Sequence, residues 1–219
     1  TSLFSLIFLT VPVKKNSTLN VALYEWIEGE NFNVVGTREV RDAINFIKKL
    51  YELSNNDNQF CGQMASEACL SIGELINQIS NRFDILVKVD NEPYLSCFLN
   101  NEFMPIYHEV VSNKVKDWGV NQAFDTELEK RYRTLSPSDF GFHNAIKLVD
   151  GQIIYIDLEY FGWDDPVKLT SDFLWHAGMK LTEPAKYEWL EGMTKIFSGD
   201  LQFNARFKLL HPLYGLRWC

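Results

Sequence analysis

The sequence predicts an α+β protein with a mainly helical body, one β-hairpin and a short β-rich segment near the N-terminus. Apolar residues recur at helical spacing over 37–51 and 71–83, which indicates two amphipathic helices. Two apolar runs, 145–149 and 152–158, flank Asp150-Gly151, which predicts a two-residue hairpin turn with positive φ at both residues. With 219 residues, 46% of them hydrophobic, the chain can bury a sizeable core.

The N-terminal segment contains two apolar runs, 3–13 and 19–27, with a turn signal at 14–17 between them. The first run contains Pro12, is too short to span a bilayer and has no basic region before it. It therefore fits neither a transmembrane helix nor a signal peptide, and we expect a buried helix end or strand. The second run is rich in β-forming residues and predicts an edge or core strand.

The first long helix is expected to begin with Thr37 as its N-cap and to end at the polar run 55–58. A second helix should start at the capping box Ser71-Ile-Gly-Glu74, in which Ser and Glu satisfy free amide groups of the first turn. After the hairpin, residues 167–178 and 184–197 predict two further helices, and a last apolar segment, 203–218, is interrupted by Pro212.

Residues 95–103 and 106–118 predict two more helical pieces. Pro105 should separate them, because proline ends or kinks a helix. Four aromatic side chains of this region are expected in the core rather than around a cofactor. They are Phe98, Phe103, Tyr107 and Trp118.

Three polar residues surround the predicted hairpin. Asp139 and Asn144 precede its first strand, and Asp157 stands near the end of its second strand. Because an antiparallel hairpin brings those ends together, Asn144 and Asp157 should share one open end of the sheet, with Asp139 close by. Two carboxylates and an amide oxygen are hard ligands of the kind that Mg²⁺ takes while it also binds phosphates. The sequence therefore predicts a magnesium–phosphate site.

The stretch from Leu135 to His176 resembles the catalytic lobe of the aminoglycoside phosphotransferase and choline kinase-like small-molecule kinases, which are relatives of the protein kinases. Their catalytic loop reads His-Gly-Asp-x4-Asn, and here Asp139 and Asn144 match it, with Pro137-Ser138 in place of His-Gly. A hairpin and a second motif, Ile-Asp-x-Glu-x-x-Gly-x-x-Asp-Pro-x-x-Asp, follow in the family. Its matches are Asp157, Glu159, Gly162, Asp165, Pro166 and, a few residues later than usual, Asp172.

This resemblance implies a protein-kinase-like fold. Residues 1–29 would be a remnant of the β-rich N-terminal lobe with the inter-lobe linker, and residues 30–219 would form the mainly helical C-terminal catalytic lobe. In the family the linker backbone hydrogen-bonds the adenine ring. Glu25, Trp26 and Ile27 would hold that place by their main-chain groups.

The resemblance also implies the chemistry, a phosphotransferase that moves the γ-phosphate of ATP or GTP to a small-molecule hydroxyl. Asp139 would accept or orient the acceptor hydroxyl, and Asn144 and Asp157 would hold Mg²⁺. The acceptor stays open among aminoglycosides, sugars, choline and similar alcohols. Asp165 is expected before a helix, where its charge favours the N-terminal dipole, and Asp172 is expected to hydrogen-bond the catalytic loop.

Several parts that such a kinase needs are not found. A Gly-containing loop should cover the phosphates and a strand Lys should pair with a helical Glu. No Gly precedes Gly29, however, and Lys14 and Lys15 stand beside the predicted turn. The chain also begins at Thr1 and ends on the apolar Trp218-Cys219. We therefore expect a fragment that lacks most of the N-terminal lobe.

The remaining histidines carry little signal. His143 stands between the loop Asp and Asn, and we expect it to pair rather than to catalyse. The others stand alone in the sequence, which predicts core or surface positions. They are His108, His176 and His211.

Composition limits the partners and the compartment. A net charge of −8 and a pI near 5.0 argue against nucleic-acid binding, which needs clustered Lys and Arg, and no membrane association is expected. The oligomeric state stays open. The four cysteines show neither Cys-x-x-Cys nor a nearby His, which is typical of reduced thiols in a cytoplasmic protein. They are Cys61, Cys69, Cys97 and Cys219.

Two other functional classes compete with the kinase hypothesis. A non-catalytic, kinase-like binding module would explain Pro137-Ser138 and the missing Gly loop and Lys, whereas the retained Asp139, Asn144 and Asp157 argue against it. A hydrolase that uses two carboxylates is the third hypothesis, but no Ser-His-Asp or Gly-x-Ser-x-Gly pattern supports it.

Overall fold

The computed structural model describes residues 12–19, 21–56, 62–115 and 125–219. Its helices are α1 (Thr37–Asn56), α2 (Ile72–Leu86), α3 (Pro93–Phe98), α4 (Met104–Glu109), α6 (Pro166–Trp175), α7 (Glu183–Ile196) and α8 (Phe203–Trp218). Its strands are β1 (Lys14–Asn16), β2 (Val21–Leu23), β3 (Thr134–Ser136), β4 (Ala145–Lys147), β5 (Ile153–Tyr155) and β6 (Gly162–Asp164). None of the helices in these ranges is long and apolar enough to cross a membrane.

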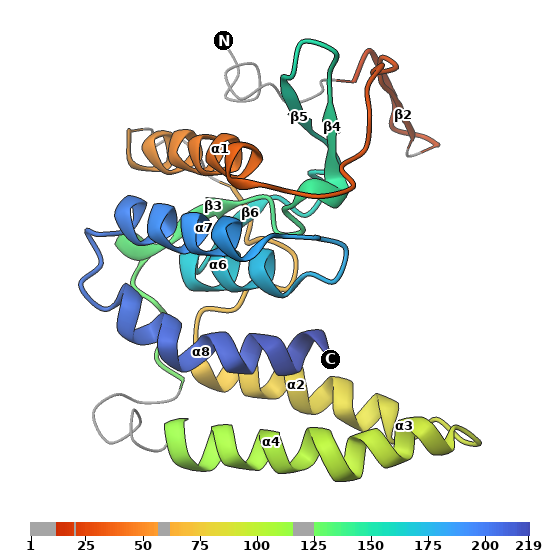
Figure 1. The fold of residues 1–219 in the computed structure, drawn as a ribbon, viewed down its shortest axis with the longest axis vertical. Coiled ribbons are helices and arrows are strands. Elements are labelled where there is room, and N and C mark those ends of the chain that lie inside the picture. Colours follow the sequence, from red (N-terminus) through yellow and green to blue (C-terminus); the bar gives the residue numbers. More distant parts are fainter. Residues whose placement is uncertain (1–11, 20, 57–61, 116–124) are drawn as a thin grey trace.

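The elements are arranged from a β-rich end to a helical end (Figure 1). The β1–β2 and β4–β5 hairpins lie at one end, α1, α6 and α7 lie in the middle, and α8, α2, α3 and α4 follow toward the other end. The described strands form three two-stranded antiparallel sheets, β1–β2, β3–β6 and β4–β5. The predicted α+β class, mainly helical with a small β portion, is confirmed.

The β4–β5 hairpin is present, but its turn differs from the prediction. The Leu148 N–H donates to the Gln152 carbonyl at 2.8 Å, so the loop consists of the three residues 149–151. Gly151 has φ 86°, whereas Asp150 is not among the residues with positive φ. The Asp150 carboxylate instead accepts a hydrogen bond from the Gln152 N–H at 2.9 Å. A three-residue loop needs a left-handed residue only at its last position, which Gly occupies here.

The N-terminal hairpin also corrects the expected turn. Residues 14–16 form strand β1 rather than a turn, and the chain reverses at 17–19. The Asn16 carboxamide oxygen accepts the N–H groups of Thr18 and Leu19, both at 3.0 Å, and so supports the reversal. Strand β2 is exposed along its length, so within the described residues it is not a core strand. Most of the first apolar run, 3–13, lies outside the described residues.

Both predicted helix starts are confirmed, with small shifts at the caps. Helix α1 begins at Thr37 itself, and the Glu39 carboxylate accepts the N–H of the preceding Gly36 at 3.2 Å. The N-cap position therefore belongs to Gly36 rather than Thr37. In α2 the Ser71 hydroxyl accepts the Glu74 N–H at 3.1 Å, as a capping box requires. The Glu74 carboxylate reaches back to the N–H of Leu70, one residue earlier than expected.

Proline does not break the helices at the two predicted places. The chain stays helical from Pro93 to Val115, with π-helical turns at Leu99–Phe103 and Val110–Val115. A π turn directly before Pro105 is wider than an α turn, and this relieves the clash between the proline ring and the preceding carbonyl groups. Helix α8 likewise continues through Pro212. The predicted interruptions are therefore wrong.

The aromatic residues of this helical region belong to the core, as predicted. Phe103 is 7% exposed, and Phe98 and Tyr107 are partly buried against the same cluster. Phe103 stacks on Phe83 of α2 with 5.7 Å between ring centroids, which joins the two helices. Trp118 lies outside the described residues.

His211 provides a test of the packing of α8. Its ring stacks between Phe207 and Trp175, at 4.7 and 4.9 Å, and burial lowers its pKa from 6.5 to about 4. The unfolded chain then binds this proton more readily than the folded chain. Stability from neutral His211 is therefore present above pH 6.5 and is lost as the pH falls toward 4.

We predict that His211→Gln removes part of the decrease in melting temperature between pH 6.5 and 4.5. His108→Gln, which changes an exposed residue of α4, serves as the matched control and should keep the wild-type pH dependence. Thermal unfolding followed by circular dichroism measures both. An unchanged pH dependence in His211→Gln would contradict this account.

Candidate active site

Asp139 stands in a short loop that follows β3 and is held by aromatic residues. Phe140 and Phe142, on either side of Gly141, are 4% and 3% exposed. The Phe140 ring lies 4.7 Å from that of Tyr155, and the Phe142 ring 5.9 Å from that of Phe173. Burial of one such ring stabilises the fold by roughly 2 kcal/mol. The core therefore fixes the loop backbone, while the Asp139 side chain stays 38% exposed.

The residue before Asp139 adopts a left-handed conformation. Ser138 has φ 68°, at the position where the resembled motif has Gly, the residue that adopts such a φ most readily. Its N–H donates to the Ser136 hydroxyl and its own hydroxyl donates to the Ser66 carbonyl, both at 3.0 Å. These bonds support the conformation that Gly would otherwise adopt without help.

Asn144 is bonded to Asp139 in two ways. Its Nδ2 group donates to the Asp139 backbone carbonyl at 3.1 Å and to the Asp139 Oδ2 at 3.2 Å. Because the amide nitrogen is used in this way, the Asn144 Oδ1 remains available as an acceptor or a cation ligand. The predicted closeness of Asp139 and Asn144 is observed.

Asp157 reaches the same end of the hairpin. The Ile156 N–H donates to the Asn144 carbonyl at 2.9 Å, which brings the next residue, Asp157, to the end of the sheet where Asn144 lies. Asp157 is exposed and has φ 57°. Glu159 chiefly raises the pKa of Tyr160, and the charges of Asp157 and Asp139 act in the same direction.

The predicted adenine-binding residues lie in the segment that leads into this region. Glu25 and Trp26 are exposed, with Trp26 85% exposed, and Ile27 is partly buried. Residues 25–27 have no regular secondary structure. Soon afterwards, Glu30 exchanges two backbone hydrogen bonds of 2.9 Å with Lys147 of β4, which fixes this segment to the hairpin. That Glu25, Trp26 and Ile27 bind adenine stays a prediction.

Two imidazole rings lie beside Asp139. The Nε2 atoms of His143 and His176 are 3.1 and 3.6 Å from the Asp139 Oδ1. The rings stack with 3.7 Å between centroids and 7° between planes, and Trp218 packs edge-on against His176. His143 pairs as expected, but the prediction that His176 stands alone is wrong. His176 comes directly after α6, so only tertiary packing brings it here.

The donor set around the hairpin end fits magnesium. The Nδ2 group of Asn144 is bonded to Asp139, which leaves the Asn144 Oδ1 available as a ligand. The Asp157 carboxylate is exposed and forms no ion pair with the described residues. Both are oxygen ligands, and Mg²⁺ is commonly held by one or two protein oxygens together with water and phosphate oxygens. These residues could therefore hold the predicted Mg²⁺.

The histidine pair fits a metal less well, although Asp139, His143 and His176 place one ligand atom each within 4.8 Å of one another. The Gly178 N–H donates to the His176 Nδ1 at 3.0 Å, so this nitrogen has a lone pair and no proton. The proton of the neutral ring is then on Nε2, the nitrogen that faces Asp139. A protonated nitrogen cannot bind a metal ion, and we therefore assign no metal to this group.

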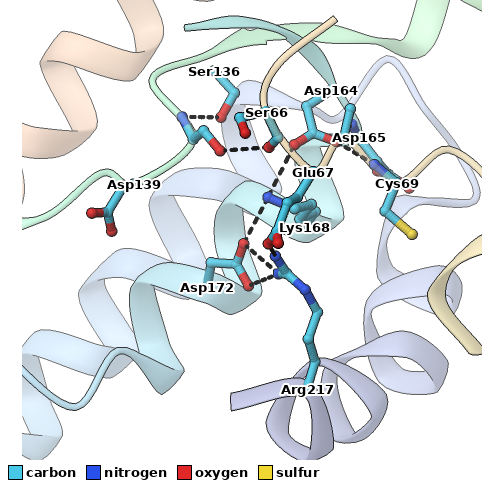
Figure 2. A network of polar contacts seen from close by, with 12 residues as sticks. Ser66, Glu67, Cys69, Ser136, Asp139, Asp164, Asp165, Lys168, Asp172 and Arg217 are labelled. Carbon is cyan, nitrogen blue, oxygen red and sulfur yellow. Dashed lines mark hydrogen bonds and ion pairs between the residues drawn. The ribbon is translucent and has the colours of Figure 1, made fainter. Parts of the chain in front are cut away.

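Lys168 is the centre of a buried ion network beneath the loop (Figure 2). Its Nζ lies 3.2 Å from Asp164 and 2.9 Å from Asp172, and all three residues are at most 7% exposed. Burial lowers the pKa of Lys168, but the two carboxylates outweigh this effect and the net pKa is raised. Burial raises the pKa of Asp164 to about 6, although Lys168 acts in the opposite direction.

The network continues to helix α8, where Asp172 has partners that the sequence did not predict. Arg217 donates to both Asp172 oxygens at 3.2 and 3.3 Å, and the Trp218 indole donates to Oδ1 at 2.8 Å. Arg217 also donates to Glu67, which pairs with Arg82 at 2.7 Å. Within the described residues, the Asp172 carboxylate is therefore bonded by Lys168 of α6 and by Arg217 and Trp218 of α8, and the predicted bond to the catalytic loop is wrong.

The Gly162 match has a steric reason. The chain at 63–65 runs beside β6, where the Trp163 N–H donates to the Gln63 carbonyl and the Ala65 N–H donates to the Trp163 carbonyl, both at 3.0 Å. A Cβ atom on Gly162 would lie 2.4 Å from the Ala65 nitrogen and 2.5 Å from the Gln63 oxygen. Only glycine permits this approach of two backbones.

Asp165 caps α6, as predicted, and borders a cavity away from the loop. Its carboxylate accepts the Val167 N–H at 2.8 Å and pairs with Arg206. A cavity of about 560 Å³ is lined by both residues together with Cys69 and Tyr214. None of the predicted site residues lines it.

Comparisons with known proteins support the fold. No family model matches the chain, and no curated protein matches it by sequence. The structure is similar to choline kinase LicA from Streptococcus pneumoniae, with a TM-score of 0.53, 11% identity and coverage of 98% of this chain and 76% of that chain. It is also similar to the streptomycin–ATP–APH(2")-IIa ternary complex, with a TM-score of 0.52, 16% identity and coverage of 92% and 63%.

The chain therefore has the aminoglycoside phosphotransferase and choline kinase-like fold, which is protein-kinase-like. This fold was predicted from the motifs between Leu135 and His176, and it is confirmed. The chain spans less than two thirds of the second neighbour, at 63% of its length.

Replacement of the buried cation tests the ion network. We predict that Lys168→Met lowers the free energy of unfolding by about 3–5 kcal/mol, because two buried carboxylates lose their counter-charge. The loss should diminish as the pH falls, since protonation then removes the uncompensated charge. Urea unfolding at several pH values measures it. Lys48→Met is the matched control, because Lys48 pairs with Glu52 on the exposed face of α1 at 3.8 Å.

A loss below about 1 kcal/mol for Lys168→Met, similar to that of an exposed pair, would show that the network contributes little to stability.

Proposed function

We propose that this chain is the catalytic part of a phosphotransferase that moves the γ-phosphate of ATP or GTP to a hydroxyl of a small molecule. Residues 1–29 are the remnant of an N-terminal lobe with the linker, and residues 30–219 are the C-terminal lobe. The two structural neighbours support this proposal, since one is a choline kinase and the other is APH(2")-IIa in a ternary complex with streptomycin and ATP.

The observation that carries the proposal is the position of Asn144. Its side chain bonds both the backbone and the carboxylate of Asp139, while its backbone carbonyl accepts from the residue before Asp157. Asn144 thus holds the acceptor-orienting carboxylate of Asp139 beside the end of the hairpin where Asp157 follows. Phosphoryl transfer depends mainly on such positioning and on charge neutralisation.

Each residue then has a role. Asp139 orients the acceptor hydroxyl and accepts its proton, and its partly exposed position leaves room for the acceptor. Asn144 and Asp157 hold Mg²⁺, which supplies neutralisation of phosphate charge when bound. The main-chain groups of Glu25, Trp26 and Ile27 hold the adenine ring.

The acceptor class is an alcohol of an aminoglycoside, a sugar, choline or a similar compound. The net charge of −8 attracts a cationic acceptor toward the protein, but it does not distinguish between these classes of acceptor.

A second function, a nucleotide-binding module without transfer, is favoured by one observation. Pro137-Ser138 replaces the His-Gly of the resembled loop, and Ser138 needs two additional hydrogen bonds to keep its positive φ. Nucleotide binding without transfer to any alcohol would support this module instead.

Calorimetric titration with ATP, with and without Mg²⁺, tests the metal ligands. We predict that Asp157→Ala weakens binding of ATP with Mg²⁺ at least tenfold, about 1.4 kcal/mol, and leaves binding without Mg²⁺ unchanged. Asp84→Ala is the matched control, because Asp84 is an exposed aspartate of α2. Equal affinities of Asp157→Ala and wild type for ATP with Mg²⁺ would exclude Asp157 as a ligand.

Transfer from radiolabelled ATP to a panel of alcohols tests the role of Asp139. We predict that Asp139→Asn lowers kcat about 10²- to 10⁴-fold, because the amide cannot accept the hydroxyl proton. Nucleotide affinity should change little, and Asp84→Asn should keep the wild-type rate. Retention of most of kcat by Asp139→Asn would contradict the role assigned to this carboxylate.

A further inference from the structure

The stacked histidines beside Asp139 have no counterpart in the resembled motif. That motif has a histidine two residues before the loop Asp, and this chain has Pro137 there. Instead, His143 comes from the loop itself and His176 from the end of α6, and both turn Nε2 toward the Asp139 Oδ1. The rings are mostly buried, with side chains 18% and 17% exposed.

Hydrogen bonding determines the protonation of His176. Its Nδ1 accepts the Gly178 N–H at 3.0 Å, and its backbone N–H donates to the Asp172 carbonyl at 2.9 Å as the C-cap of α6. The ring of His176 therefore presents an N–H group, not a lone pair, to Asp139. Burial and then the neighbouring His143 lower the pKa of His176, which keeps the ring neutral at pH 7.

The same argument applies to His143. Its Nδ1 is buried and has no hydrogen-bond partner among the described residues. With the proton on Nδ1, that N–H would be buried without an acceptor, and the Nε2 lone pair would face the Asp139 carboxylate, which can only accept. The proton therefore belongs on Nε2, where the Asp139 Oδ1 at 3.1 Å accepts it.

We propose that His143 and His176 are positioning residues for Asp139. His143 donates its Nε2–H to Oδ1, and His176 holds the His143 ring by stacking and directs its own Nε2–H toward the same oxygen. A carboxylate has about four lone-pair sites. With Oδ1 facing both imidazoles and Oδ2 bonded by Asn144, one site of Oδ2 is left for the acceptor hydroxyl. The catalytic consequence rests on the proposed function, whereas the hydrogen bonding does not.

Nitrogen NMR tests the hydrogen bonding without any activity. The chain has four histidines, so long-range ¹H–¹⁵N spectra can be assigned with single His→Gln variants. We expect His143 and His176 to carry their proton on Nε2, and Asp139→Asn to shift the resonances of these two rings while those of His108 and His211 stay in place. An Nδ1–H tautomer in either ring, or no shift in Asp139→Asn, would overturn the proposal.

Kinetics test the catalytic consequence. His143→Ala should lower kcat for transfer about 10- to 100-fold, because the carboxylate is no longer held, and should leave the KM for ATP with Mg²⁺ unchanged. His143→Gln should restore much of the rate, because its amide provides an N–H at a similar reach. His176→Ala should lower kcat less, and His108→Ala should not lower it. Melting temperatures show whether each variant is folded.

The outcomes separate this proposal from the proposed function. Full kcat in folded His143→Ala, or no recovery in folded His143→Gln, would overturn the positioning role even if the chain is a kinase. Wild-type protein that shows the expected tautomers and the Asp139→Asn shifts, but transfers phosphate to no alcohol, would support the histidine pairing and contradict the proposed function.

Discussion

The structure depends on the buried charges around Lys168. An ammonium group and two carboxylates are withdrawn from water together, which is tolerable only because each of them is paired at close to 3 Å. The pairs join β6 through Asp164 and α8 through Asp172 and Arg217. Because β6 is the partner of β3, this network lies directly beside the strand that leads into the loop with Asp139.

The loop itself is held from two sides by different physics. On the inner side, the rings of Phe140 and Phe142 are buried, and this non-directional attraction fixes the backbone. On the outer side, His143 and His176 face the Asp139 Oδ1 and Asn144 donates to Oδ2, which leaves one lone-pair site of Oδ2 open to a further partner. The carboxylate is thus both partly exposed and restricted in orientation, which suits a group that must meet an acceptor.

Prediction from sequence succeeded where the signal was local and failed where a local rule met tertiary packing. The apolar period of α1 and the capping box of α2 indicated helices that the structure contains, because these interactions lie within a few residues. Pro105 and Pro212 predicted breaks, but a π turn accommodates Pro105, and burial of the apolar residues on both sides of Pro212 keeps α8 continuous. The hairpin at Asp150-Gly151 was predicted, but its three-residue loop was not. The hydrogen bond from the Leu148 N–H to the Gln152 carbonyl determines the loop length.

The sequence by itself determined the fold class and the meeting of Asn144 with Asp157, since a hairpin joins residues that are close in the chain. The i, i+4 spacing of Asp164, Lys168 and Asp172 was also visible in it, although not its burial. Only the tertiary structure decided that Asp172 binds α8 rather than the loop, and that His176 lies against Asp139. Those contacts join segments far apart in sequence, and their partners depend on how α6 and α8 pack.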